Sequence, residues 1–149
     1  MPSEFTIRRR VEFSETDMAG IVHFSNFFKY METVEHAFYR SLGFSVVMAK
    51  HDPPVGFPRV HASCDYSRPI RFEDEMEIQL RVIEKKAKTL TYQIIFQKVA
   101  GDESEEVARG KLIVVCVAHQ RDGAMKAVPI PPEFAAALSV TEPKAPEVR

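Results

Sequence analysis

One stretch organises the chain, residues 11–42, VEFSETDMAGIVHFSNFFKYMETVEHAFYRSL. Its pattern is that of a strand end, a short polar loop and one long apolar helix. Ser25 and Asn26 are suitable N-cap residues, and Gly43 is suited to the position just after the last helical turn. We therefore expect a helix from about residue 26 to residue 42, roughly 25 Å long at a rise of 1.5 Å per residue.

This helix carries apolar side chains at the i, i+3 and i+4 spacing of a buried face. The stripe comprises Phe27, Phe28, Met31, Val34, Phe38 and Leu42, and Tyr30, Ala37 and Tyr39 widen it. A helix that is apolar over so much of its surface needs a sheet curved around it.

The rest of the chain is rich in strand patterns. Residues 5–13 alternate in polarity, but Arg9 interrupts their apolar face, which predicts a bulge or a sheet edge there. Further strands are expected at residues 60–72, 76–82, 90–97 and 112–118, a hairpin at Asp122-Gly123, and a helical turn at residues 133–138. The run at 112–118 is apolar on both faces, which is typical of a central strand.

This order predicts an α+β fold with one domain, residues 1–140, in which a curved antiparallel sheet wraps one long central helix. Residues 141–149 are expected to form a flexible C-terminal tail. Such a sheet leaves an edge and a face to cover, and dimerisation would cover them.

Composition excludes several classes of protein. A net charge of −1 argues against a general nucleic-acid binder, which would need a strongly basic face. No run approaches the roughly 18 apolar residues of a membrane span, and the first residues lack the apolar segment of a signal peptide. We therefore expect no membrane or nucleic-acid partner, a cytoplasmic location, and Cys64 and Cys116 as buried free thiols.

The residues Asp17-Met18-Ala19-Gly20-Ile21-Val22-His23-Phe24-Ser25-Asn26-Phe27-Phe28 resemble the 4-hydroxybenzoyl-CoA thioesterase family of hotdog-fold acyl-CoA thioesterases. Weaker matches to the same family lie at residues 65–75, DYSRPIRFEDE, and at residues 84–89, EKKAKT. The resemblance covers about residues 5–135. It implies a single hotdog domain.

For the chemistry, the resemblance implies that Asp17 is the catalytic carboxylate, as nucleophile or general base. It also implies that the Phe24 backbone N–H, at the start of the helix, is an oxyanion donor. A helix N-terminus supplies free N–H groups and the positive end of a dipole, and thioester hydrolysis needs such donors for its carbonyl oxygen. Spacing alone favours a different role, in which Asp17 only accepts a hydrogen bond from its own turn.

The remaining candidate residues surround this junction or match the family's CoA-binding turn. Expected substrate-binding residues are Gly20, His23, Asn26, Phe27 and Tyr66, and expected CoA-binding residues are Lys86 and Lys88. Asn26 is equally suited to cap the helix, and the two lysines are equally suited to a solvated turn. Glu32 and Glu35 are alternative acids, and otherwise they would form a solvated or inter-subunit helix face.

Together these observations predict an acyl-CoA thioesterase for aryl- or short- to medium-chain acyl groups. We expect it to work without a metal ion or cofactor, as a homodimer or homotetramer. Two alternatives stay open at this point: a non-catalytic acyl-thioester-binding module, and a hotdog hydratase or dehydratase. The second usually carries a catalytic histidine in a distinct motif, which the sequence does not display.

Overall fold

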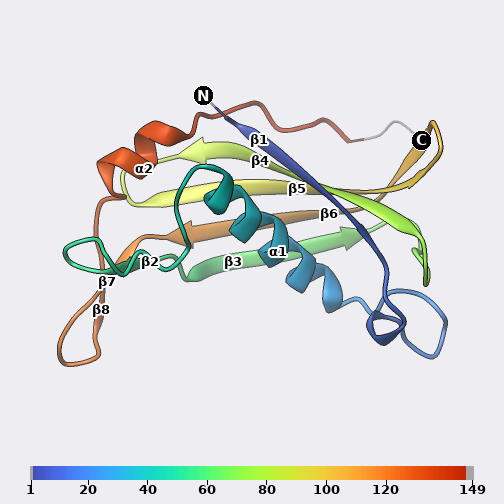
Figure 1. Cartoon of the computed structure of the whole chain (residues 1–149), viewed down its shortest axis with the longest axis horizontal. Coiled ribbons are helices and arrows are strands. Elements are labelled where there is room, and N and C mark those ends of the chain that lie inside the picture. Colours follow the sequence, from blue (N-terminus) through green and yellow to red (C-terminus); the bar gives the residue numbers. More distant parts are fainter. Residues whose placement is uncertain (1, 147–149) are drawn as a thin grey trace.

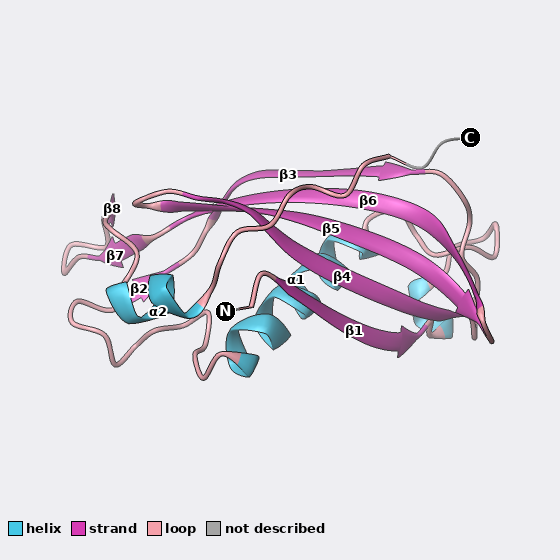
Figure 2. Cartoon of the chain, turned by 90° about the horizontal axis from the view of Figure 1, so that it is seen from above, coloured by secondary structure: helices cyan, strands magenta, loops and turns pink. Residues whose placement is uncertain are grey.

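The computed structural model describes residues 2–146 and has one main sheet with one long helix against it (Figure 1). The strands of this sheet are β1 (Glu4–Arg10), β3 (Arg59–Tyr66), β4 (Glu75–Lys85), β5 (Thr89–Ala100) and β6 (Glu103–Val115). They are antiparallel and ordered β1-β4-β5-β6-β3. Figure 2 shows the sheet curving over helix α1 (Asn26–Ser41), so the predicted α+β hotdog architecture is confirmed.

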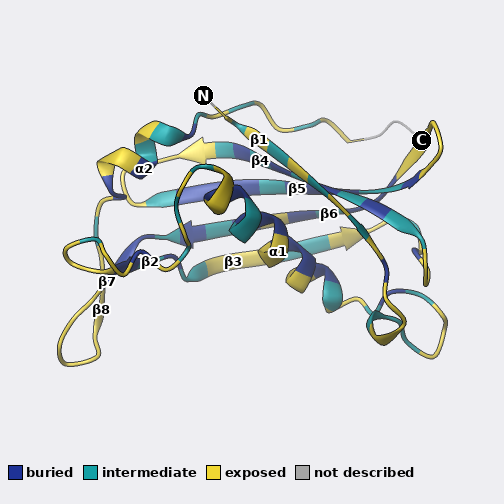
Figure 3. Cartoon of the chain, in the orientation of Figure 1, coloured by how far each residue is buried: buried dark blue, intermediate teal, exposed yellow. Residues whose placement is uncertain are grey.

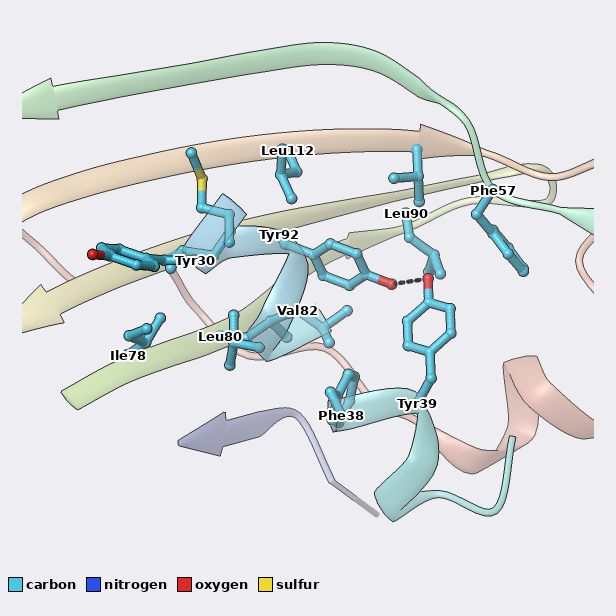
Figure 4. Packing of buried hydrophobic residues seen from close by; sticks show 14 of the residues in the cluster. Tyr30, Phe38, Tyr39, Phe57, Ile78, Leu80, Val82, Leu90, Tyr92 and Leu112 are labelled. Carbon is cyan, nitrogen blue, oxygen red and sulfur yellow. Dashed lines mark hydrogen bonds between the residues drawn. The ribbon is translucent and has the colours of Figure 1, made fainter. Parts of the chain in front are cut away.

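Helix α1 begins and ends close to where its local sequence predicts. Ser25 is the N-cap and Leu42 the C-cap, and Gly43 takes a positive φ of 86° that reverses the chain. Figure 3 shows that α1 has both buried and exposed stretches along its length. Its buried apolar side chains are Phe27, Tyr30, Met31, Val34, Phe38 and Tyr39. Phe28, expected in this stripe, lies at its border and is exposed. In the core, the hydroxyls of Tyr39 and Tyr92 are hydrogen-bonded at 2.7 Å (Figure 4).

Strand β1 is an edge strand, as the interruption at Arg9 predicted. Phe5, Ile7 and Arg9 occupy its inward positions. The strand ends at Arg10, earlier than expected, because Val11 is tied to the turn at residues 71–74: its N–H donates to Asp74 O and its carbonyl accepts from Glu73 N. The prediction that Phe13 lies on the buried face of this strand is wrong, since Phe13 begins a short 3-10 turn, η1 (Phe13–Glu15), and is exposed.

A second, smaller sheet and a short helix lie at one end of the main sheet. They comprise β2 (Val55–Gly56), β7 (Val117–His119), β8 (Met125–Ala127) and α2 (Pro132–Ala137). The predicted hairpin at Asp122-Gly123 joins β7 to β8, with Gly123 at φ 83°. The predicted interior position of residues 112–118 is confirmed, because β6 and β7 each lie between two other strands, but the prediction of one continuous strand is wrong, because Cys116 separates β6 from β7.

The C-terminal segment crosses the outer face of the main sheet, opposite α1 (Figure 2). Thr141 N donates to Val82 O, and the side chain of Gln93 is hydrogen-bonded to both the N–H and the carbonyl of Lys144. The expected flexibility of this tail stays a prediction, and its residues 147–149 lie outside the described part. Cys64 and Cys116 are free thiols, half-buried and buried.

Candidate active site

The loop between β1 and α1 is fixed at both ends by backbone hydrogen bonds. Asp17 N donates to Ile21 O and Gly20 N donates to Asp17 O, both at 2.9 Å, which closes a tight turn. Gly20 has a φ of 78°, a conformation that favours glycine. Val22 N donates to Ile70 O at 2.8 Å, so the turn is anchored to the chain that follows β3.

The Asp17 carboxylate is half-buried and uses one oxygen in its own turn. Oδ1 accepts a hydrogen bond from Ala19 N at 2.8 Å. Within residues 2–146, no hydrogen-bond donor reaches Oδ2. The carboxylate therefore has the local turn role that spacing favours, and it also keeps an oxygen that is open to another reactant.

Asp17 lines a cavity of about 420 Å³ together with Ile21, Phe24, Phe27, Tyr66 and Arg68, among others. Phe27 packs edge-on against Tyr66, with ring centroids 5.1 Å apart. The Tyr66 hydroxyl donates to Phe24 O at 2.8 Å, which fixes the peptide at the entrance of the helix. This cavity therefore brings three of the predicted site residues, Phe24, Phe27 and Tyr66, beside Asp17.

Phe24, the residue before the N-cap of α1, lines this cavity and keeps a backbone N–H that is free within residues 2–146. Asn26 N donates to His23 O and Phe28 N donates to Ser25 O, so these two amides are engaged. In the described part of the chain the N–H of Phe24 has no hydrogen-bond acceptor. Because the side chain of Ser25 makes no capping bond to the helix, the positive end of the helix dipole also stays open.

His23 and Asn26 adjoin the cavity but are occupied by neighbouring groups. His23 Nδ1 is hydrogen-bonded to Ser25 Oγ at 2.7 Å, and its ring stacks on Phe24. Asn26 donates from Nδ2 to Glu15 O at 2.7 Å, so it fastens the loop to the helix. Asn26 is the first residue of α1 and not its N-cap, and its role in orienting the substrate stays a prediction.

Lys86 and Lys88 lie at the opposite end of the main sheet from Asp17. β1 pairs Arg10 with Glu75 at the Asp17 end, and β4 then runs 11 residues to Lys85. At about 3.3 Å per residue this separates the two ends by roughly 35 Å. Both lysines are exposed, and within a single chain they cannot contact a ligand held by Asp17.

The two glutamates considered as alternative acids differ from each other. Glu32 is exposed, whereas Glu35 is completely buried. The prediction of a solvated or inter-subunit face is therefore wrong for Glu35. Arg59 Nη2 donates to Glu35 Oε1 at 2.5 Å. Burial raises the pKa of Glu35 to about 7, although Arg59 acts in the opposite direction.

Arg68, which the sequence offers as a further basic residue for CoA binding, lines the cavity, whereas the ion pair of Arg9 with Glu15 was not predicted. The sequence signal for the pair was the charged residue on the apolar face of β1. No group of three or more His, Cys, Asp or Glu among residues 2–146 is placed to hold a metal ion. None of the helices described in that range is long and apolar enough to cross a membrane.

Comparison with known proteins gives consistent matches. The family model of the thioesterase-like superfamily matches residues 11–138. A putative esterase of Aquifex aeolicus is 38% identical over 94 residues, which cover 63% of this chain and 73% of that protein. A 1,4-dihydroxy-2-naphthoyl-CoA hydrolase of Nostoc punctiforme is 39% identical over 79 residues, which span 51% of each protein.

Solved structures extend the similarity over most of the chain. A gentisyl-coenzyme A thioesterase is 31% identical with a TM-score of 0.74, over 89% of this chain and 98% of that one. The 4-hydroxybenzoyl-CoA thioesterase of Pseudomonas sp. strain CBS-3 is 18% identical with a TM-score of 0.80, over 91% of this chain and 99% of that one. The second match, at this low identity, supports the fold alone.

Proposed function

The chain belongs to the thioesterase-like superfamily, and from that premise we propose that it hydrolyses an acyl-CoA thioester with Asp17 as the catalytic carboxylate. One observation carries the proposal: the cavity is lined by both Asp17, whose Oδ2 accepts no hydrogen bond from residues 2–146, and Phe24, whose N–H has no acceptor there. An attacking group and an oxyanion donor are the two parts that acyl transfer requires.

Two routes use this arrangement. As a nucleophile, Asp17 would bond to the carbonyl carbon and expel the CoA thiolate, and water would then hydrolyse the mixed anhydride. As a general base, it would take a proton from a water molecule while the water oxygen attacks the same carbon. Either route places negative charge on the carbonyl oxygen, where one preorganised donor such as Phe24 N–H contributes about 10²- to 10³-fold in rate.

The preferred acyl group is proposed to be aromatic. Phe24, Phe27 and Tyr66 line the cavity beside Asp17 and offer ring faces and edges for an aryl group. The relatives named for aromatic substrates, a 1,4-dihydroxy-2-naphthoyl-CoA hydrolase and a gentisyl-coenzyme A thioesterase, favour the same class. Straight short- or medium-chain acyl groups are the alternative to be assayed beside it.

In a homodimer, Asp17 of one subunit would lie near the lysines in the turn at residues 86–88 of the partner subunit. β3 is an edge strand with no partner on its outer side in the described chain, and it ends at Tyr66 beside Phe24. β3 begins near the turn at residues 86–88, because both segments are hydrogen-bonded to the end of β6. Val115 N donates to Pro58 O, just before β3, and Cys116 N donates to Lys88 O. Antiparallel pairing of β3 with its copy would therefore bring the partner subunit's Lys86 and the partner subunit's Lys88 to the Asp17 end, where they could bind CoA phosphates.

The test is the substitution Asp17→Asn. An asparagine keeps an oxygen for Ala19 N and so preserves the turn, but it removes the charge. Thiol release from benzoyl-, phenylacetyl- and straight-chain acyl-CoAs should fall by at least about 10²-fold. Unchanged turnover in a folded variant would remove Asp17 from the mechanism. Thioester binding without thiol release by the unmodified protein would instead favour the binding module.

A further inference from the structure

Arg9 places a guanidinium on the inward face of an edge strand. Phe5 and Ile7 occupy the preceding inward positions of β1, and Val11, two residues later, is completely buried. The Arg9 side chain itself is 26% exposed. Removing a charge from water costs free energy unless a group of opposite charge accepts its hydrogen bonds, so its partners indicate its role.

The guanidinium contacts the loop and the helix at once. Arg9 Nη2 donates to Glu15 Oε2 at 2.5 Å, and Arg9 Cζ lies 4.5 Å from the centroid of the Tyr30 ring. Tyr30 belongs to α1 and is buried. Burial, followed by the Glu15 carboxylate, raises the pKa of Tyr30 far above its ordinary value, so the ring stays neutral beneath the cation.

Glu15 is the point where this contact reaches the active-site loop. Its Oε1 accepts from Glu12 N at 2.8 Å. Its backbone carbonyl accepts two further bonds, from His23 N at 2.9 Å and from Asn26 Nδ2 at 2.7 Å. Glu15 thus fastens the beginning of the loop, the turn before the helix and the first helical residue to one another.

The two groups proposed to take part in the reaction lie close in the sequence to the residues that these hydrogen bonds hold together. Asp17 is two residues after Glu15, and Phe24 is one residue after His23. The hydrogen bond from His23 N to Glu15 O, together with that from Asp17 N to Ile21 O, therefore restricts how far Asp17 can move relative to Phe24. We propose that Arg9, acting through Glu15, is a positioning residue that holds Asp17 in register with the Phe24 N–H; this rests on the proposed function.

Position, rather than charge, is the effect expected from Arg9. Its positive charge is matched by Glu15, so the pair presents little net charge to Asp17. Arginine suits the site because its planar group can pair with a carboxylate and stack on an aromatic ring simultaneously. A lysine would retain the ion pair and lose the stacked plane, and a methionine would retain only the volume.

The experiment compares the kinetics of Arg9→Met, Glu15→Gln and their double variant with Arg8→Met as the matched control. Arg8 is the adjacent residue on β1 but points outward to Glu77 at the surface. We expect Arg9→Met and Glu15→Gln each to lower kcat by about 10- to 100-fold with KM within about twofold, because misplacement of reacting groups affects the transition state. The double variant should lose no more than either single one, since the two residues act as a unit. Arg9→Lys should recover part of kcat.

The outcomes separate this inference from the proposed function. Asp17→Asn is run in the same assay: if it stays active, the proposed site is wrong whatever Arg9 does. If Asp17→Asn is inactive while folded Arg9→Met and Glu15→Gln keep the normal kcat, only the role of Arg9 is refuted. A loss confined to KM, or an equal loss in Arg8→Met, would also overturn it. Should Arg9→Met fail to fold, Glu15→Gln and Arg9→Lys carry the same test.

Discussion

Glu35 is a buried, ion-paired carboxylate whose surroundings could not be predicted from its neighbours in the sequence. It follows the start of α1 by nine positions and is completely buried against Arg59, which begins β3. Oε2 of Glu35 has no hydrogen-bond partner among residues 2–146. The carboxylate is therefore only half satisfied, and burial raises its pKa to about 7 in spite of Arg59.

The raised pKa predicts that stability falls as pH rises. Glu35 binds a proton more tightly in the folded chain than at its ordinary pKa of 4.5, so its contribution is complete below about pH 4.5 and is lost as pH rises through about 7. Glu35→Gln should remove this dependence, which we expect to be about 1–3 kcal/mol in the free energy of unfolding between pH 5 and pH 8. Urea unfolding at both pH values, at one protein concentration, measures it.

The control for this prediction is Glu133→Gln, an exposed glutamate on α2 that has no bond to Glu35 or Arg59 among the described residues. The other groups that act on Glu35 are Arg59 from β3, Glu32 and His36 from α1, and the Tyr39–Tyr92 pair of α1 and β5. All of them remain in both variants. A pH dependence of Glu35→Gln equal to that of the unmodified protein would show that Glu35 does not titrate in this range.

At the scale of elements, predictability follows the range of the interactions involved. The bounds of α1 follow from neighbouring residues, Ser25 before it and Gly43 after it. The division of residues 112–118 at Cys116 depends on Lys88, whose carbonyl accepts Cys116 N, so no pattern within the run could indicate it. The same applies to the site: the junction at Asp17 was predictable, whereas the ion pair of Arg9 and the buried pair of Glu35 were not.

The C-terminal segment is the element whose motion can be measured most directly. Gln93 from β5 is hydrogen-bonded to both backbone groups of Lys144, and Arg109 from β6 donates to Lys144 O and Ala145 O, each at 2.6 Å. Gln93→Ala removes the first two bonds, worth about 1–2 kcal/mol of local stability. Trypsin should then cut after Lys144 roughly 10-fold faster, as followed by the loss of mass from the intact chain.

Gln79→Ala is the comparison for that experiment, because Gln79 lies half-buried on β4, in register with Ile95 of the neighbouring β5, and has no contact with the C-terminal segment among the described bonds. Its cleavage rate should match that of the unmodified protein. Equal, rapid cleavage in all three proteins would mean that the segment is flexible as the sequence predicted and that its hydrogen bonds do not hold it.

At the scale of the whole molecule, the two edges of the main sheet differ in chemistry. Along β1, Arg8 and Arg10 form ion pairs with Glu77 and Glu75 of β4. Charged side chains on an edge strand oppose pairing with another chain. β3 instead exposes Val60 and Ala62 at the opposite edge. The difference favours β3 as the edge at which a second copy would add its own sheet.

Val60→Glu tests whether assembly and activity depend on the same edge. Val60 is 62% exposed in the single chain, so a glutamate there costs little until a partner covers it. Burial of that unpaired charge should weaken the dimer by at least about 10²-fold, equivalent to about 3 kcal/mol. Light scattering across a concentration series should then show monomer, and thiol release per chain should fall with the dimer fraction, because the partner's Lys86 leaves with the partner.

Val140→Glu, at a valine that is also exposed but lies beyond α2 on the C-terminal segment, should leave both measurements unchanged. A monomeric chain with full activity would show that one copy contains the complete site, and the proposed role of the second subunit would be withdrawn.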